Sequence, residues 1–258
     1  MKPGKPATSP EAIHELRVAL KRSRAVLRLI RPYLSKQSFA GEDATLRAIA
    51  KKLAPHRDAE VIQKTLERAL EDCDADVRRQ MHGRVSTLAD PKKDPAEKGA
   101  AKAAVNALRR FLVQREIRPG APEPDFKMFR WGACESYRKA RKKLKRAFKT
   151  RSAADFHACR KWCSRLFLQL QVLEEFVPSK MAKRIPDYDA FQKELGKHHD
   201  LHLAKSAMAA NAPKADEAYS LGQVLRSLDS RAERSERRAR RDRGLFAASP
   251  RSFFSSLG

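Results

Sequence analysis

Residues 10–31 of this 258-residue chain have the sequence PEAIHELRVALKRSRAVLRLIR, and this stretch decides the fold class. Its apolar residues recur at intervals of three, four and seven positions, which is the spacing of one face of an α-helix. These residues are Ile13, Leu16, Leu20, Leu27, Ile30 and, just beyond the stretch, Leu34. Ser9 before Pro10 marks a helix start, and Pro32 stops the helix after about Arg31. The pattern predicts a long amphipathic helix whose apolar stripe faces a core.

A second row on the same helix consists of basic and titratable side chains that recur with the same spacing, one position further along. The row contains His14, Arg17, Lys21, Arg24, Arg28 and Arg31. One position is a rotation of about 100°, and successive members lie roughly 5–6 Å apart, so the row runs beside the core stripe. A solvated helix face usually places acids four positions from its bases, but this row contains none. A solvated face stays open as an interpretation, and the lack of acids favours a ladder that binds a linear polyanion.

The rest of the chain shows the same helical periodicity, and no segment alternates convincingly like a strand. A polar turn lies at 90–95, and the strongest break lies at 119–124, close to the midpoint. The predicted helices cover 39–53, 58 to beyond 70 with fraying before 88, 97–116, 125–149, 153–176, 179–195, 200–211 and 214–243. A Phe-containing tail at 246–258 is expected to dock on the surface. The fold class is therefore predicted to be all-α.

The two halves of the chain share short motifs, which indicates an internal duplication. Ile13-His14-Glu15-Leu16-Arg17 aligns with Phe156-His157-Ala158-Cys159-Arg160, and Leu53-Ala54-Pro55-His56-Arg57-Asp58 aligns with Leu195-Gly196-Lys197-His198-His199-Asp200. Both alignments keep nearly the same separation along the chain. We therefore predict one domain at 8–254, a helical bundle of two similar four-helix units at 8–118 and 125–254 around a basic central groove. Residues 1–7 are predicted to be a flexible N-terminus.

The composition indicates an anionic partner. The chain has 56 Lys and Arg against 31 Asp and Glu, a formal net charge of +25 and a pI near 10.4. Aromatic residues make up only 7%, which is low for a protein that stacks on nucleic-acid bases. No apolar run is long enough to span a membrane, and the first residues lack the apolar segment of a secretory signal, so a cytoplasmic location is expected. The four cysteines form no C-x-x-C pair and are expected to be reduced and buried.

More basic residues surround the second copy of the motif. The second row begins with His157 and Arg160 but loses its charge at Ser164 and Phe167, and Arg165 beside the row partly restores it. The preceding helix carries a basic face made of Arg138, Arg141, Lys142 and Lys145. An arginine run lies near the C-terminus, at 231–243. It fits two interpretations equally well: a solvated helix with internal ion pairs, or an anion-binding surface.

With His14-x-x-Arg17 followed by Lys21-Arg22-x-Arg24, and with the repeat His157-x-x-Arg160, the chain resembles the CHAD family, named for a conserved histidine α-helical domain. The resemblance covers about residues 8–254. It implies a helical bundle of two similar halves around a basic cavity that binds inorganic polyphosphate, often with association to polyphosphate granules. It also implies that the basic residues of these motifs contact the phosphate chain.

Physical chemistry agrees with a phosphate ligand. Lys and Arg release counterions when they neutralise phosphates, and the planar guanidinium of Arg binds two phosphate oxygens at once. A nearby anion favours the protonated form of His, so binding should tighten between about pH 8 and about pH 5.5. The expected polyphosphate ligands are His14, Arg17, Lys21, Arg22, Arg24, Arg28, Arg57, Arg138, Arg141, Lys142, Lys145, His157, Arg160, Arg165 and His199. No catalytic residue, metal or cofactor is expected.

Three rival functions stay open from the sequence. His199-Asp200 is the dipeptide of metal-dependent HD phosphohydrolases, and His198 and His202 share a helix face. An enzyme is the weaker alternative, because the matching site in the first half has Arg57 in place of a metal ligand. Binding to nucleic acid is a stronger alternative because RNA and DNA present the same phosphates, although no helix-turn-helix, zinc-finger or RNA-recognition motif is present. A basic interaction protein fits the C-terminal arginine run but not the ordered ladder.

Overall fold

A computed structural model describes residues 10–88, 95–113, 126–210 and 215–257. Within these ranges the regular elements are helices and no strand occurs, which confirms the all-α prediction. The α-helices are α1 (Pro10–Leu29), α2 (Lys36–Lys52), α3 (Ala54–Leu70), α4 (Ala75–Leu88), α5 (Pro95–Val113), α6 (Phe126–Thr150), α7 (Ala153–Leu173), α8 (Pro178–Ala182), α9 (Ile185–Ala209), α10 (Ala218–Arg241) and α11 (Pro250–Leu257). The short 3-10 helices are η1 (Arg31–Tyr33), η2 (Ala215–Glu217) and η3 (Asp242–Phe246). None of these described helices combines the length and apolar character needed to cross a membrane. The flexible N-terminus predicted at 1–7 lies outside the described residues.

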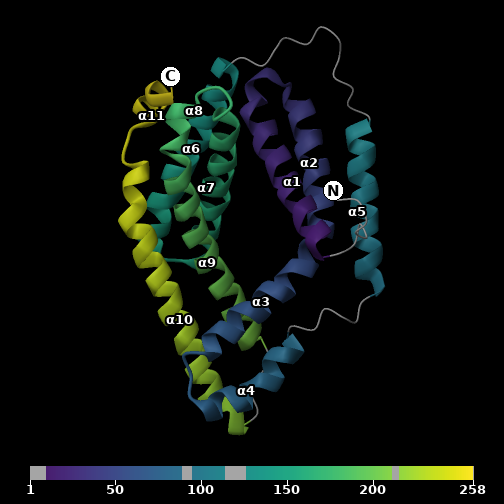
Figure 1. Cartoon of the computed structure of the whole chain (residues 1–258), viewed down its shortest axis with the longest axis vertical. Helices are drawn as coiled ribbons and strands as arrows, with labels where there is room; N and C mark the ends of the chain where they lie inside the picture. The colour runs from purple at the N-terminus through teal and green to yellow at the C-terminus, as the bar shows by residue number, and fades with distance from the viewer. Residues whose placement is uncertain (1–9, 89–94, 114–125, 211–214, 258) are drawn as a thin grey trace.

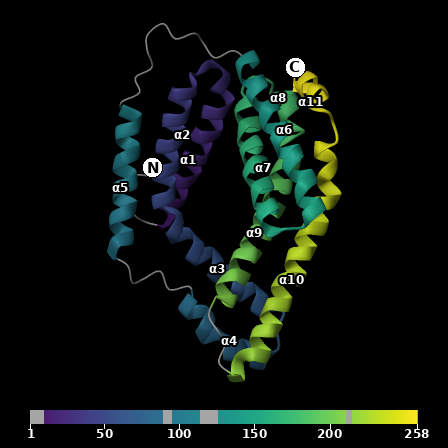
Figure 2. The same cartoon turned by 180° about the vertical axis from the view of Figure 1, so that it is seen from behind.

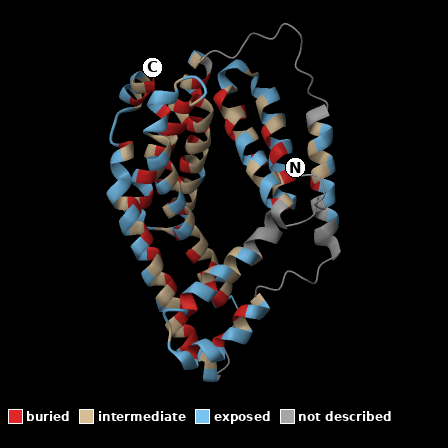
Figure 3. Cartoon of the chain, viewed as in Figure 1, coloured by how far each residue is buried: buried red, intermediate tan, exposed pale blue. Residues whose placement is uncertain are grey.

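In the described part of the chain, buried side chains form three apolar cores. The largest lies mainly among α6, α7, α9 and α11 and includes Tyr137 and Phe191. A second lies where α3 and α4 meet the C-terminal part of α9 and the first turns of α10, around Met81, and a third joins α1, α2 and α5 around Leu46. Figures 1 and 2 show this grouping from opposite sides, with α9 and α10 running from the first core to the second. Figure 3 shows the buried residues on the sides of the helices that face one another.

Helix α1 connects the third core to the first, because it contacts α2 on one side and α6 and α7 on the other. Leu20 belongs to the third core, whereas Leu29 is fully buried in the first. Where α1 meets α6, a Cβ added to Gly132 would lie 2.6 Å from the Cα of Leu29, so only glycine permits this approach. Further along, Gln169 of α7 donates a 3.0 Å hydrogen bond to the carbonyl of Ala25. These contacts place the two helices that carry the predicted ladders side by side.

The prediction for the third helix is wrong at its C-terminal end. The helix ends at Leu70, and a separate helix, α4, begins at Ala75. Acidic residues follow Leu70, and they are unfavourable at the negative end of a helix dipole. One of them, Asp72, instead accepts hydrogen bonds of 2.7 and 2.8 Å from Arg231 of α10. This ion pair connects the α3–α4 turn to α10.

The predicted helix break between 195 and 200 is also wrong, because α9 runs through it without interruption. Gly196 lies against Arg160 of α7, and a Cβ there would stand 3.7 Å from Nη2 of that arginine. Residues 179–195 instead divide between α8 and α9, and Pro186 lies in the first turn of α9, where its missing N–H has no intrahelical partner to lose. The predicted halves contain α1–α5 and α6–α11, which is more than four helices each. The duplication itself stays a prediction.

The described part of the C-terminal tail docks on the bundle, as predicted. The ring of Tyr137 in α6 stacks on Phe253 of α11 at 4.0 Å between centroids and on Phe246 of η3 at 5.4 Å. The Tyr137 hydroxyl also donates a 3.0 Å hydrogen bond to the carbonyl of Ala248. Residues 218–257 are therefore part of the same folded body as the helices before them.

Candidate functional site

A cluster of guanidinium groups surrounds the buried carboxylate of Asp43 in α2. Asp43 is 3% exposed, and its oxygens accept hydrogen bonds from Nε of Arg24 at 2.9 Å and Nη2 of Arg28 at 3.3 Å, both in α1. Arg47, one turn later in α2, donates from Nη2 at 2.6 Å. Burial raises the pKa of Asp43, but the hydrogen bonds from Arg24 and Arg47 outweigh burial, so this pKa lies below its usual value. The ionised carboxylate thus holds two members of the α1 ladder in place.

Arg165 of α7 adds a fourth guanidinium to this group, which we call the Asp43 cluster: Arg24, Arg28, Asp43, Arg47 and Arg165. Burial, followed by the nearby charges of Arg28 and Arg24, lowers the pKa of Arg165 to about 9. Among the described residues Arg165 forms no ion pair, and its Cζ lies 4.2 Å from the ring centroid of Trp162. At neutral pH four cations therefore share one carboxylate, and an added anion would relieve their repulsion.

Two aromatic rings form the apolar side of the Asp43 cluster. The Cζ of Arg28 lies 5.1 Å from the ring centroid of Phe39 and 5.7 Å from that of Trp162, both within the range of a cation–π contact. Nζ of Lys139 in α6 lies 4.8 Å from the Trp162 centroid. Nε of Arg28 is buried and has no hydrogen-bond acceptor among the described residues. The cluster therefore keeps an unused donor between two ring faces.

The N-terminal part of the α1 ladder has a different environment. Arg17 donates a hydrogen bond from Nη1 to the carbonyl of Leu53, between α2 and α3. This bond satisfies a carbonyl at the C-terminal end of α2, where the helix dipole is negative, so Arg17 supports the fold. His14, Lys21 and Arg22 are exposed. The exposed basic residues of α1 thus extend from the Asp43 cluster along the helix.

The second predicted ladder meets α9. Nδ1 of His157 in α7 lies 3.1 Å from Nδ1 of His199 in α9, and Nη1 of Arg160 lies 3.4 Å from Oδ1 of Asp200 one turn along. Burial, and then the charges of Lys161 and Arg160, lower the pKa of His157. The structure therefore brings together three predicted ligands, His157, Arg160 and His199, on the facing sides of α7 and α9.

The predicted ligands of α6 form no ion pair or hydrogen bond with the Asp43 cluster in the described structure. Arg138 binds Glu135 of its own helix through two 2.9 Å hydrogen bonds, and Nε of Arg141 donates a 3.0 Å bond to the carbonyl of Phe246 in η3. Lys142 and Lys145 are exposed. The last predicted ligand, Arg57, lies in the first turn of α3, and its side chain is outside the described residues.

The residues of the rival metal site have separate partners. Nε2 of His198 lies 3.3 Å from Nε2 of His202, whereas His199 faces His157 and Asp200 faces Arg160. Among the side chains that the structure describes, no group of three or more His, Cys, Asp or Glu is arranged to hold a metal ion. The four residues of that hypothesis therefore do not converge on one point.

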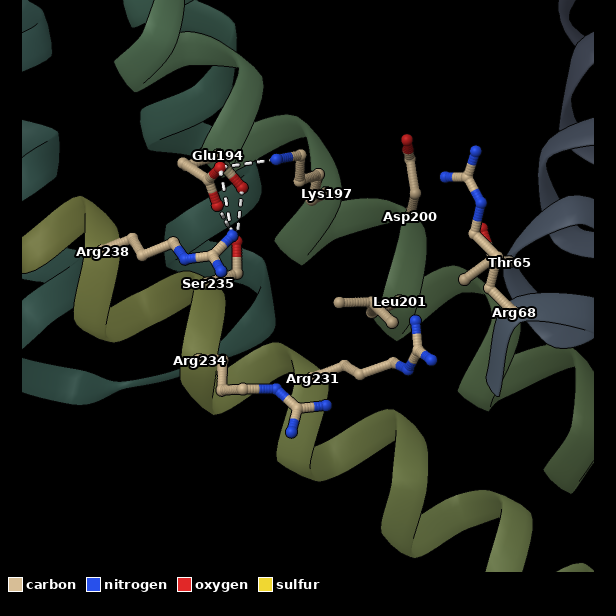
Figure 4. A pocket seen from close by; sticks show the side chains of 10 residues that line it. All are labelled: Thr65, Arg68, Glu194, Lys197, Asp200, Leu201, Arg231, Arg234, Ser235 and Arg238. Carbon is tan, nitrogen blue, oxygen red and sulfur yellow. Dashed lines mark hydrogen bonds and ion pairs between the residues drawn. The ribbon is translucent and has the colours of Figure 1, made fainter. Parts of the chain in front are cut away.

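A second basic site, which the sequence did not predict as a unit, lies where α3, α9 and α10 meet (Figure 4). Its pocket has a volume of about 260 Å³. The lining residues are Thr65, Arg68, Glu194, Lys197, Asp200, Leu201, Arg231, Arg234, Ser235 and Arg238. We call it the α3–α9–α10 pocket. Part of the arginine run at 231–243 therefore lines a concave site.

Sequence reasoning also missed important residues of the Asp43 cluster. Asp43 and Arg47 stand four positions apart, which is the spacing of an ion pair on one helix, and this pair was the available signal. Phe39, Trp162 and Lys139 had no comparable signal, because their contacts with the arginines come from different helices.

Comparison with known proteins supports the resemblance found in the sequence. A family model described as the CHAD domain matches residues 5–209, which include α1 to α9. A search of curated proteins found no match. The matched range contains both histidine motifs and the whole Asp43 cluster. Because the match extends over most of the sequence, the chain belongs to the CHAD domain family.

Proposed function

We propose that this protein binds inorganic polyphosphate on a basic surface that begins at the Asp43 cluster and continues along α1 and α7. We further propose that it acts by binding alone, with no catalytic step, and that it collects on cytoplasmic polyphosphate granules. Membership in the CHAD family is compatible with this role. The observation that carries the proposal is the Asp43 cluster, in which three guanidinium groups bind a single carboxylate and Arg165 adds a fourth positive charge near them.

A chain of phosphates matches the shape of this surface. The exposed residues His14, Lys21 and Arg22 extend the basic surface from the cluster along α1, and His14 and Lys21 are about two helical turns apart. A linear polyanion can follow such a row, whereas a single phosphate neutralises only one or two members. Each Lys or Arg that contacts a phosphate adds a counterion-release contribution, so the affinity should fall steeply with salt.

The aromatic residues at the cluster favour a bare phosphate chain over nucleic acid. Proteins that hold single strands stack bases on aromatic rings. Trp162 is instead approached by Lys139, Arg165 and Arg28, with the closest of these cations 4.2 Å from its centroid. Phe39 is approached by Arg28 and Arg31, each at 5.1 Å. Rings already in contact with guanidinium groups present less surface to a base.

A competition titration tests the proposal. Long-chain polyphosphate, RNA and duplex DNA are compared at matched phosphate concentration and about 0.15 M salt. We expect polyphosphate to bind at least tenfold more tightly, about 1.4 kcal/mol. Equal competition by the three polymers would mean that net charge acts without selectivity, and the proposal would be abandoned.

A pair of matched variants locates the site. Lys21→Glu with Arg22→Glu reverses two exposed charges on α1, and Lys180→Glu with Lys183→Glu reverses two exposed charges on or next to α8. The α1 pair should weaken polyphosphate binding by more than tenfold beyond the α8 pair. Arg17 is unsuitable for this test because it also binds the carbonyl of Leu53. Equal losses in both pairs would reject the proposed surface.

A further inference from the structure

The α3–α9–α10 pocket contains more positive than negative charge. It is lined by five basic residues and two carboxylates, Glu194 and Asp200. Both carboxylates have cationic partners: Oε1 of Glu194 accepts a 2.6 Å bond from Lys197, and Asp200 pairs with Arg160 at 3.4 Å. Figure 4 shows the lining side chains on the three helices, with Lys197 and Arg238 directed toward Glu194. The pocket therefore has cations in excess of the acids that line it.

Three arginines of the pocket form no direct hydrogen bond to an acidic side chain among the described residues. Arg234 lies 3.6 Å from Asp72, and Arg238 lies 3.8 Å from Glu194, both longer than a direct N–H···O hydrogen bond. Arg68 of α3 forms no ion pair among the described residues. By contrast, Arg231 binds Asp72 through two bonds of 2.7 and 2.8 Å. Three guanidinium groups from two helices therefore keep their donors for a ligand.

The size and lining of the pocket restrict that ligand. A volume of about 260 Å³ is below the roughly 300–1,000 Å³ of pockets for drug-sized molecules. Leu201 supplies the apolar part of the lining, and Thr65 adds a hydroxyl group. One guanidinium group can donate two parallel hydrogen bonds to the oxygens of a phosphate, which suits a small and highly charged anion.

We propose that the α3–α9–α10 pocket binds a compact phosphate anion of the size of pyrophosphate. The pocket adjoins the polyphosphate surface, because Asp200 in its lining pairs with Arg160 of α7, but its arginines belong to α3 and α10. The loosely engaged Arg68, Arg234 and Arg238 bind the oxygens of the anion. Two of these come from α10, which lies beyond residue 209, where the family match ends. The inference does not depend on polyphosphate binding at the other surface.

Calorimetric titration with inorganic pyrophosphate, at about 0.15 M salt, tests the pocket on the full chain. The pocket variant is Arg68→Gln with Arg234→Gln. The matched control is Arg226→Gln with Arg251→Gln, which removes two exposed charges that do not line the pocket. We expect the pocket variant to weaken pyrophosphate binding at least tenfold and the control to change it less than twofold. Circular dichroism checks that all proteins keep the same helix content.

Each other outcome overturns the inference. Equal weakening by the two variants would assign the effect to overall charge, and unchanged binding in the pocket variant would remove the site. If the pocket variant affects only long polyphosphate, the pocket is part of the polymer surface and not a separate site. If the pocket variant unfolds, the single variant Arg238→Gln is tested in its place, and it should also weaken pyrophosphate binding at least tenfold. Lys21→Glu with Arg22→Glu should weaken long polyphosphate and not pyrophosphate, which separates a failure here from a failure of the proposed function.

Discussion

At the scale of single residues, Asp43 has two opposing effects on the α1 ladder. Its carboxylate offsets the repulsion among Arg24, Arg28 and Arg47, and it fixes the first two of these side chains on α1. It also occupies donors that a phosphate would use. Because Asp43 is the one acid of the Asp43 cluster and pairs with three of its four arginines, its removal leaves these arginines without a negative charge inside the cluster.

Asp43→Asn should therefore lower the free energy of unfolding by about 3 kcal/mol, since it leaves buried charges uncompensated. Urea unfolding at neutral pH measures this loss. Asp76→Asn is the control, because Asp76 is 90% exposed and its ion pair among the described residues is a surface pair with Arg79. Saturating polyphosphate should raise the free energy of unfolding of Asp43→Asn more than that of the natural chain. Equal stability of the two variants would contradict this account of Asp43.

Buried His198 and its half-buried neighbour His202 make the fold sensitive to acid. Burial, together with the neighbouring His202, lowers the pKa of His198 to about 4, and the ring packs 4.2 Å from Phe156. In the unfolded chain this pKa is about 6.5, so between these two values the unfolded state binds a proton that the native state does not. Stability should be constant above about pH 6.5 and should fall as the pH drops toward 4.

Urea unfolding at about pH 7.5, 6 and 5 tests this prediction, with a loss on the order of 2 kcal/mol expected at the lowest pH. His198→Gln keeps a polar partner for His202 and should flatten the pH profile. The lowered pKa values of His157 and His202 act in the same direction, so a residual slope is expected. A natural chain that is as stable at pH 5 as at pH 7.5 would refute the prediction.

The sequence predicted which basic side chains share one face of α1, but it did not predict which acid or aromatic ring they would contact. Arg24 and Arg28 were expected in the ladder, and both belong to the Asp43 cluster, because helical periodicity determines the face of a single helix. Asp43 stands 15 residues from Arg28, and Trp162 stands on another helix. Periodicity carries no information about which face of α2 or α7 packs against α1. Asp43 and Trp162 could therefore be identified as partners only from the structure.

At the scale of helices, the contact between α1 and α6 depends on Gly132. A side chain there would collide with the backbone of Leu29, which cannot move away as a flexible side chain can. Gly132→Ala should lower the free energy of unfolding by roughly 1–3 kcal/mol through overpacking. Gly41→Ala in α2 is the matched control, because nothing lies within 4 Å of its added Cβ. Alanine there should stabilise the helix by about 0.4–1 kcal/mol.

Thermal unfolding followed by circular dichroism compares the two glycine variants. A shift of opposite sign in their midpoints supports the close crossing of α1 and α6. If both substitutions raise the midpoint, the helices do not approach closely at Gly132. The result also bears on binding, because this crossing holds α1 beside α7 and so places Arg24 and Arg28 next to Arg165.

Most helices were predictable to within a few residues, and the exceptions have physical causes. Acidic residues follow Leu70, where α3 ends, and they are unfavourable at the negative end of a helix dipole. The break predicted between 195 and 200 contains Gly196, and glycine is a weak helix former. In the structure it lies inside α9, where its small size accommodates Arg160. Helix propensity depends on residue type alone, so it could not predict that Arg160 packs beside Gly196.

At the scale of the whole molecule, α9 and α10 connect two of the three cores. Residues near the start of α10, such as Leu221 and Val224, are buried in the second core, whereas Ala239 and the following Phe246 are buried in the first. The family match ends at residue 209 and thus omits α10 and α11. Without these elements, Met81 and Leu201 in the second core and Tyr137 in the first would lose neighbours.

A chain that ends at residue 209 should therefore fail to unfold cooperatively, although it contains the whole matched domain. A chain that ends at residue 248 keeps α10 and η3 and loses only α11, so it should fold with a lower midpoint. Urea unfolding distinguishes the cases, because the slope of the free energy with denaturant scales with the surface that unfolding exposes. A chain ending at residue 209 with the slope and midpoint of the full chain would show that residues 5–209 fold alone, and α10 would then be an added element of the binding surface and not a structural one.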